Sequence, residues 1–79
     1  MIEVVETNDR LILVCSYKNE VYLLEDLLDL KFPAANYEMA NYKEKSAIYL
    51  EKDSNIPEEY QSSNGLKFFI NSNISKVAS

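Results

Sequence analysis

The sequence predicts an α+β domain: a small antiparallel β-sheet of four to five strands, with one amphipathic helix over about residues 24–32 packed on one face. Two observations lead to this fold class. The segments LILVCSY, SAIYL and LKFFI alternate or run together as strands do, and turn residues separate them. Only the segment EVYLLEDLLDLKFP repeats its apolar residues with a strong helical period.

The length limits the chain to one domain. A chain of 79 residues buries roughly 60% of its unfolded surface, so a stability on the order of 5 kcal/mol is expected. The hydrophobic fraction of 47% is ordinary for a globular protein and too high for disorder at this charge. We therefore expect residues 1–79 to form a single small globular domain whose polar C-terminal residues 72–79 fray.

The first predicted element is a β-hairpin. Ile2–Thr7 is strand-like, the sequence TNDR is typical of a turn, and Leu11–Tyr17 forms the second strand. The second strand is apolar on both faces, which indicates a central strand or one covered on both sides. Cys15 lies within it, so the sequence predicts a buried, unreactive thiol.

The start of the helix is open to two interpretations. Either Asn19 caps a helix that runs from Glu20 to Leu30, or Glu20–Leu23 is a third strand and the helix begins near Leu24. We prefer the second, because Val21 and Tyr22 favour a strand and the acids would then lie in the first helical turn. Pro33 predicts the end of the helix.

The helix has one apolar and one acidic side. The acidic side presents Tyr22, Glu25, Asp26 and Asp29. The apolar side predicts a core face, in which Leu27 and Leu28 are central; it comprises Val21, Leu23, Leu24, Leu27, Leu28, Leu30 and Phe32.

The second half of the chain is less uniform. Residues 34–45 are interpreted as a short helix or a loop, because Ala35, Met39 and Tyr42 recur at helical spacing. Ser46–Lys52 is a predicted strand with Ile48 and Leu50 inward.

Three short segments follow that strand. Ile56–Tyr60 is typical of a single helical turn, with proline at its start and acids behind it. Ser62–Gly65 is a predicted loop with the only glycine, and Leu66–Asn71 is the predicted last strand.

The charge of the chain limits the classes of partner that it is expected to bind. With a net charge of −5, one arginine and seven scattered lysines, the chain lacks the clustered cations that bind phosphate backbones or anionic membranes. An acidic protein can be attracted to a basic protein partner, although moderate negative charge also simply aids solubility. The first ten residues carry glutamates where a signal peptide would carry lysines, so we expect a soluble, cytoplasmic protein.

Residue types needed for most catalytic and metal sites are missing. The sequence has no histidine, one cysteine and one glycine, which excludes the usual zinc sites, imidazole-based triads and phosphate-cradling loops. We therefore expect no enzyme, no catalytic residue, no metal and no cofactor.

The residues that remain as candidates are for binding a protein partner. They combine carboxylates with tyrosines, which serve as contact residues in many interfaces. The predicted set is Tyr22, Glu25, Asp26, Asp29, Glu58, Glu59 and Tyr60.

Two functions from different classes are compatible with the sequence. The first is an inhibitor of the kind made by phages or mobile elements, such as anti-restriction or anti-CRISPR proteins, which covers the basic surface of a nucleic-acid-handling protein. The second is an accessory subunit, antitoxin or immunity protein that oligomerises through Phe68-Phe69 and the region of Tyr37 and Tyr42. The first predicts a monomer and the second a homodimer or larger assembly.

Overall fold

The computed structural model describes residues 2–52 and 55–78. These residues form four strands, two α-helices and one 3-10 turn. In chain order they are β1 (Glu3–Glu6), β2 (Arg10–Val14), α1 (Lys18–Lys31), β3 (Tyr37–Tyr42), β4 (Lys45–Glu51), the 3-10 turn η1 (Glu58–Tyr60) and α2 (Ser63–Ala78).

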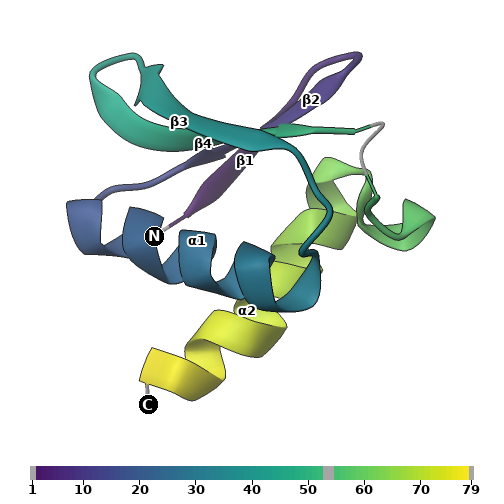
Figure 1. The fold of residues 1–79 in the computed structure, drawn as a ribbon. Helices are drawn as coiled ribbons and strands as arrows, with labels where there is room; N and C mark the ends of the chain where they lie inside the picture. Colours follow the sequence, from purple (N-terminus) through teal and green to yellow (C-terminus); the bar gives the residue numbers. More distant parts are fainter. Residues whose placement is uncertain (1, 53–54, 79) are drawn as a thin grey trace.

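The strands make one antiparallel sheet in the order β1-β2-β4-β3, and both helices lie on the same side of it (Figure 1). The α+β fold class predicted from the sequence is thereby confirmed, with a second helix in addition to the predicted one. β1 and β2 pair as the predicted hairpin, and β2 lies inside the sheet between β1 and β4. Neither helix in the described part of the chain is long and apolar enough to cross a bilayer.

The main core lies between the sheet and the two helices. Ile48 and Leu50 point into it as predicted, and Leu28 is 1% exposed. Leu27 is only partly buried at its margin. The buried members of this core are Val4, Leu11, Leu13, Cys15, Val21, Leu24, Leu28, Phe32, Ile48, Leu50, Ile56, Leu66, Phe69 and Ile70.

The helix α1 begins six residues before the preferred prediction, which is therefore wrong. Its first turn is held by the Glu20 carboxylate, which accepts 2.9 Å hydrogen bonds from the backbone N–H groups of Ser16 and Tyr17. Val21 is buried in the core one turn before Leu24, so packing overrides its strand propensity. The predicted end is confirmed, because α1 stops at Lys31, two residues before Pro33.

The apolar side of α1 is narrower than the helical wheel predicts. Val21, Leu24 and Leu28 are buried, and Phe32 is buried just beyond the last turn. Leu23 and Leu30 are exposed, Leu30 by 74%.

Residues 34–45 contain a strand and a turn, so the predicted helix or loop is wrong. β3 pairs with β4 through a two-residue turn at Lys43 and Glu44, both of which have positive φ. Such turns match the twist of a hairpin. The sequence signal is weak because β3 is at the edge of the sheet, and no residue between Tyr37 and Tyr42 is fully buried.

The final segment is helical, and the predicted strand at Leu66–Asn71 is wrong. Leu66, Phe69 and Ile70 are buried, whereas Phe68 is 68% exposed. Buried positions at intervals of three and four residues are the pattern of a helix, and the partly buried Ile74 continues it.

The predicted loop at Ser62–Gly65 is instead the start of α2. The Ser62 hydroxyl accepts a 3.1 Å hydrogen bond from the Gly65 N–H, which is the arrangement of an N-cap. Residues 72–78 belong to α2, and Ser79 lies outside the described residues. The helical turn predicted at Ile56–Tyr60 is present as η1.

The burial of Cys15 leads to a prediction of its chemistry. Burial, with a smaller contribution from Glu20, raises the pKa of the thiol to about 11. Because the thiolate is the reactive form, we expect the native protein at neutral pH to resist a thiol reagent that labels the denatured protein fully. The measurement is the rate of labelling with and without denaturant, and rapid labelling in the native state would show that Cys15 is accessible.

Candidate functional site

One side of α1 faces the outer edge of the sheet, where β3 lies. Lys18, Tyr22, Asp26 and Asp29 recur at intervals of three or four residues and therefore share a stripe on the helix. The Tyr37 hydroxyl of β3 donates a 2.6 Å hydrogen bond to the Asp29 carboxylate. This bond connects the acidic stripe of α1 to the edge strand.

The pKa of the Tyr37 hydroxyl depends on the carboxylates of α1. Partial burial of the ring raises the pKa of the Tyr37 hydroxyl above its ordinary value, and the bond to Asp29 and the negative charge of Glu25 and Asp26 raise it further. A phenolate would be repelled by all three carboxylates. Of the four acidic-face residues predicted from the helical wheel, Asp29 contacts Tyr37 directly, and Glu25 and Asp26 act on it through their charge.

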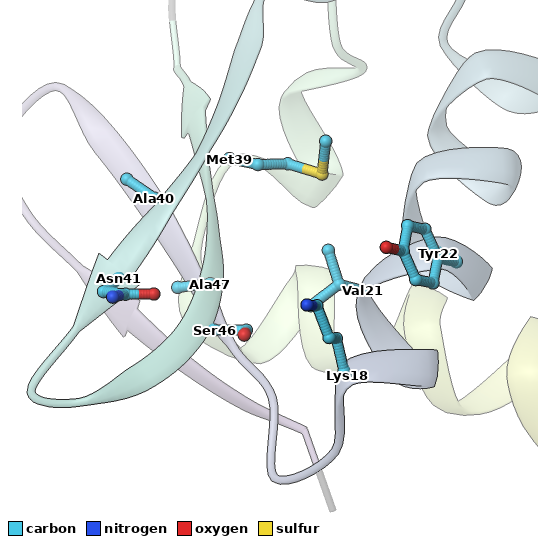
Figure 2. A pocket seen from close by; sticks show the side chains of 8 residues that line it. All are labelled: Lys18, Val21, Tyr22, Met39, Ala40, Asn41, Ser46 and Ala47. Atoms are coloured by element: carbon cyan, nitrogen blue, oxygen red, sulfur yellow. The ribbon is translucent and has the colours of Figure 1, made fainter.

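A shallow groove of about 240 Å³ continues this surface toward the start of α1 (Figure 2). Met39 extends from β3 toward the helix, and Lys18 and Val21 point from the helix toward the sheet. Tyr22 lies beside them, and it is 54% exposed; Met39 is 50% exposed. The groove therefore offers apolar contact area beside Lys18, and the carboxylates of α1 lie outside its lining.

We call this surface the α1–β3 face. It contains one hydrogen-bonded pair, one groove and three carboxylates. Its residues are Lys18, Tyr22, Glu25, Asp26, Asp29, Tyr37, Met39 and Asn41.

The carboxylates of the α1–β3 face are unfavourable for the helix that carries them. Because α1 begins at Lys18, Glu25 and Asp26 lie past its middle and Asp29 lies in its last turns, where the helix dipole disfavours acids. Glu25 and Asp29 are also four residues apart, a like-charge spacing that destabilises a helix. Within residues 2–52 and 55–78, no lysine or arginine forms an ion pair with any of the three.

The remaining predicted binding residues lie elsewhere. Glu58 and Glu59 are exposed on η1 and do not contribute to the shifted pKa of Tyr37. The Tyr60 ring packs against Phe32 and Phe69, with ring centroids 6.0 and 5.0 Å away. Tyr60 therefore helps to attach η1 to the helices, and the structure does not bring this trio into the α1–β3 face.

Four members of the face were not among the predicted binding residues: Lys18, Tyr37, Met39 and Asn41. Tyr37, Met39 and Asn41 alternate along β3, so recognition of that segment as a strand would have placed them on one side. Lys18 could have been found by extending the helix one turn toward the N-terminus. Both identifications require the correct bounds of β3 and of α1, and these were not predicted from the sequence.

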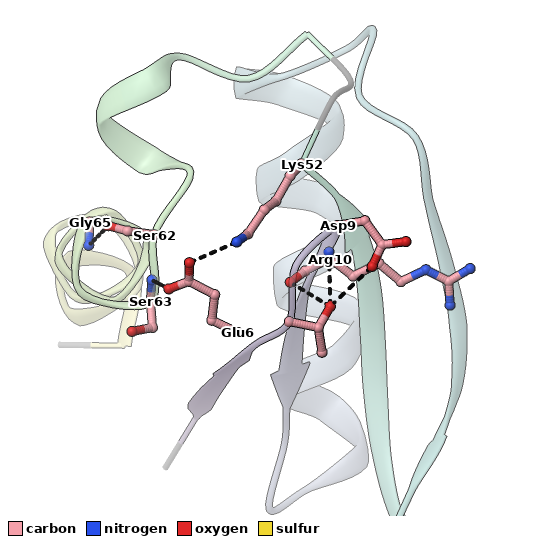
Figure 3. Close-up of polar contacts among 8 residues, drawn as sticks. Glu6, Asp9, Arg10, Lys52, Ser62, Ser63 and Gly65 are labelled. Carbon is pink, nitrogen blue, oxygen red and sulfur yellow. Dashed lines mark hydrogen bonds and ion pairs between the residues drawn. The ribbon is translucent and has the colours of Figure 1, made fainter.

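A second polar cluster has a structural role (Figure 3). The Glu6 carboxylate accepts hydrogen bonds from the Lys52 ammonium at 2.7 Å and from the Ser63 N–H at 2.9 Å. Lys52 and then the Ser63 amide hold the pKa of Glu6 below its ordinary value. Because the carboxylate lies at the first residue of α2, it also complements the helix dipole, and the cluster anchors α2 to β1.

The sheet surface opposite the helices is covered by its own side chains. Ile12, Val14 and Ala47 are buried beneath Val5, Tyr42 and Tyr49. The Tyr49 hydroxyl donates a 2.9 Å hydrogen bond to the carbonyl oxygen of Asn41, and Arg10 lies 5.9 Å from the Tyr49 ring centre.

The second function considered above, an accessory protein that oligomerises, requires Phe68-Phe69 to present an exposed apolar surface. Phe69 belongs to the core, which leaves only Phe68 of that pair at the surface. Tyr37 and Tyr42, its other proposed contacts, are both half-buried. Tyr37 points to the helix side of the sheet and Tyr42 to the opposite side.

No group of three cysteine, aspartate or glutamate side chains close enough to hold a metal ion occurs among the described residues. No protein-family model, no curated protein and no solved structure matches the chain. The α1–β3 face is therefore interpreted from its own geometry and charge.

Proposed function

We propose that this protein is a non-enzymatic binding protein that uses the α1–β3 face to cover a basic surface of a protein partner. A partner surface of that kind is found where a protein handles nucleic acid, and covering it would inhibit the partner, as phage and mobile-element inhibitors do. The observation that carries the proposal is the set of three carboxylates on α1, Glu25, Asp26 and Asp29, none of which forms an ion pair with a lysine or arginine among the described residues.

The energetics of α1 support this function over a merely soluble helix surface. Acids placed against the helix dipole and against each other cost a few tenths of a kcal/mol per pair. Residues that lower the stability of their own helix are common at functional sites. A basic partner would compensate for this loss of stability, and Tyr22 and Met39 would add apolar contact next to the charges.

The charge-reversed variant Asp26→Lys/Asp29→Lys tests the proposal. We expect it to fold with a stability within about 1 kcal/mol of the parent, because exposed helix charges contribute little. We expect its affinity for the partner to fall by about 10- to 100-fold, since each reversed charge meets a basic group. The partner is first identified by affinity capture with the parent protein, and its affinity for the purified variants is then measured by calorimetry at several salt concentrations.

Two controls separate the charge from other effects. Tyr37→Phe removes the hydrogen bond to Asp29 and keeps all charges, so it should retain most of the affinity. Glu58→Lys/Glu59→Lys makes the same change in net charge outside the face. If this control weakens binding as much as the reversal on α1 does, net charge alone drives association; full affinity of the α1 variant would refute the proposed face.

A further inference from the structure

We infer that the partner presents an extended basic segment, which adds to the free edge of β3 as a fifth strand and places side chains on the α1–β3 face. This inference rests on the proposed function and specifies how the partner binds. The described chain has no strand beyond β3, which is the last in the order β1-β2-β4-β3.

The hydrogen bonds of the β3–β4 ladder show which backbone groups remain free. The Glu51 N–H donates to the Asn36 carbonyl oxygen at 3.0 Å, so this pair is one of the hydrogen-bonded pairs of the ladder. Such pairs alternate along an antiparallel ladder, and the register therefore directs the backbone groups of Tyr37, Met39 and Asn41 away from β4. The Asn41 carbonyl already accepts the Tyr49 hydroxyl, which leaves three N–H groups and two carbonyls for an added strand.

β3 also has few of the features that usually protect an edge strand, and Glu38 is its one charged residue. The segment YEMANY has no proline and no lysine, and its register with β4 continues over six residues without a bulge. The other edge differs, because β1 has four residues and the Glu6 carboxylate at its end binds Lys52 and the start of α2. A strand can therefore add at β3 more readily than at β1.

The side chains beside the free edge define the kind of segment. Tyr37, Met39 and Asn41 have free backbone groups, and their side chains lie on the same side of the sheet as α1, next to the groove. An added strand would alternate its side chains, so every second one would face α1. At the Tyr37 end of this path the Asp29 carboxylate would accept a basic side chain, and Met39 at its middle would accept an apolar one.

A short peptide tests the inference directly. We propose the capped peptide Thr-Val-Thr-Lys-Thr-Val-Thr, which is the same in both chain directions and puts valine, lysine and valine on one face. In NMR titrations of isotope-labelled protein, the amide protons of Tyr37, Met39 and Asn41 should move downfield as they form hydrogen bonds, together with amides around Asp26. The same peptide with glutamate in place of lysine should bind about tenfold more weakly.

A proline substitution distinguishes the contribution of the β3 backbone to peptide binding from the contribution of its side chains. Met39→Pro removes an outward N–H that makes no bond to β4, and proline is tolerated at such edge positions. It should lower the peptide affinity by about tenfold or more relative to Met39→Val, because both variants lose the methionine side chain and only the proline variant also loses the N–H. The titration of the parent protein gives the same information if the proline variant does not fold.

The outcomes distinguish the two proposals. Shifts around Asp26 without shifts on β3, or full affinity of Met39→Pro, would overturn strand addition and leave the acidic face in place. No shift in either region at millimolar peptide would overturn strand addition, and the charge reversal on α1 with the captured partner then decides the proposed function separately. A dimer in light scattering that Met39→Pro converts to a monomer would show that a second copy of the chain, rather than a basic segment, occupies the edge.

Discussion

Replacing Leu28 by alanine is expected to remove most of the stability of the protein. The side chain is 1% exposed and lies in the core between α1 and the sheet, so its loss leaves a cavity that the fixed strands cannot fill. Substitutions of this kind cost about 2–5 kcal/mol. A domain of this length has a total stability on the order of 5 kcal/mol, so the variant should be partly unfolded at 37 °C.

Leu30→Ala is the matched control for that prediction. This substitution removes the same atoms two residues later in the same helix, but the Leu30 side chain is 74% exposed. We expect a change within about 0.5 kcal/mol. Urea denaturation followed by circular dichroism measures both variants, and equal midpoints would contradict the orientation of α1.

Replacing Gly65 by alanine is expected to destabilise the protein, although alanine normally stabilises a helix by about 1 kcal/mol relative to glycine. A Cβ at this position would collide with the carbonyl oxygen of Glu59, and it would lie 3.1 Å from the Ser62 hydroxyl oxygen. The obstacle is backbone, so η1 must move away from α2. Overpacking of this kind costs about 1–3 kcal/mol.

Asn64→Ala provides the comparison for Gly65. It changes the neighbouring residue in the first turn of α2, where the side chain is exposed, and it should alter stability by no more than about 0.5 kcal/mol. The measurement is the melting temperature of both variants by thermal unfolding. A melting temperature raised by Gly65→Ala would show that η1 does not approach α2 as closely as described.

The local sequence pattern predicted an element correctly where that element is buried and the residues around it favour the same secondary structure. β2 alternates Leu11 and Leu13 into the main core, which Cys15 joins just after the strand, while Ile12 and Val14 are buried on the other side. This agrees with the predicted central strand. The inward positions of β4 were predicted for the same reason, and the end of α1 was predicted because the residue before a proline avoids helical dihedral angles. The acidic side of α1 was likewise visible, because helical spacing alone brings Tyr22, Asp26 and Asp29 together.

The fold class, the pairing of β1 with β2, most of the core and the acidic residues of the candidate face were thus predictable from the amino-acid sequence. The start of α1, the helical structure of residues 66–71 and the edge strand at residues 37–42 became clear only from the folded protein. At the start of α1 and in residues 66–71, burial in the core overrode strand propensity. Residues 37–42 are mostly exposed, and their pairing with β4 overrode the weak helical periodicity. The groove and the contact between Tyr37 and Asp29 join residues from separate elements, so only the packing of α1 on the sheet brings them together.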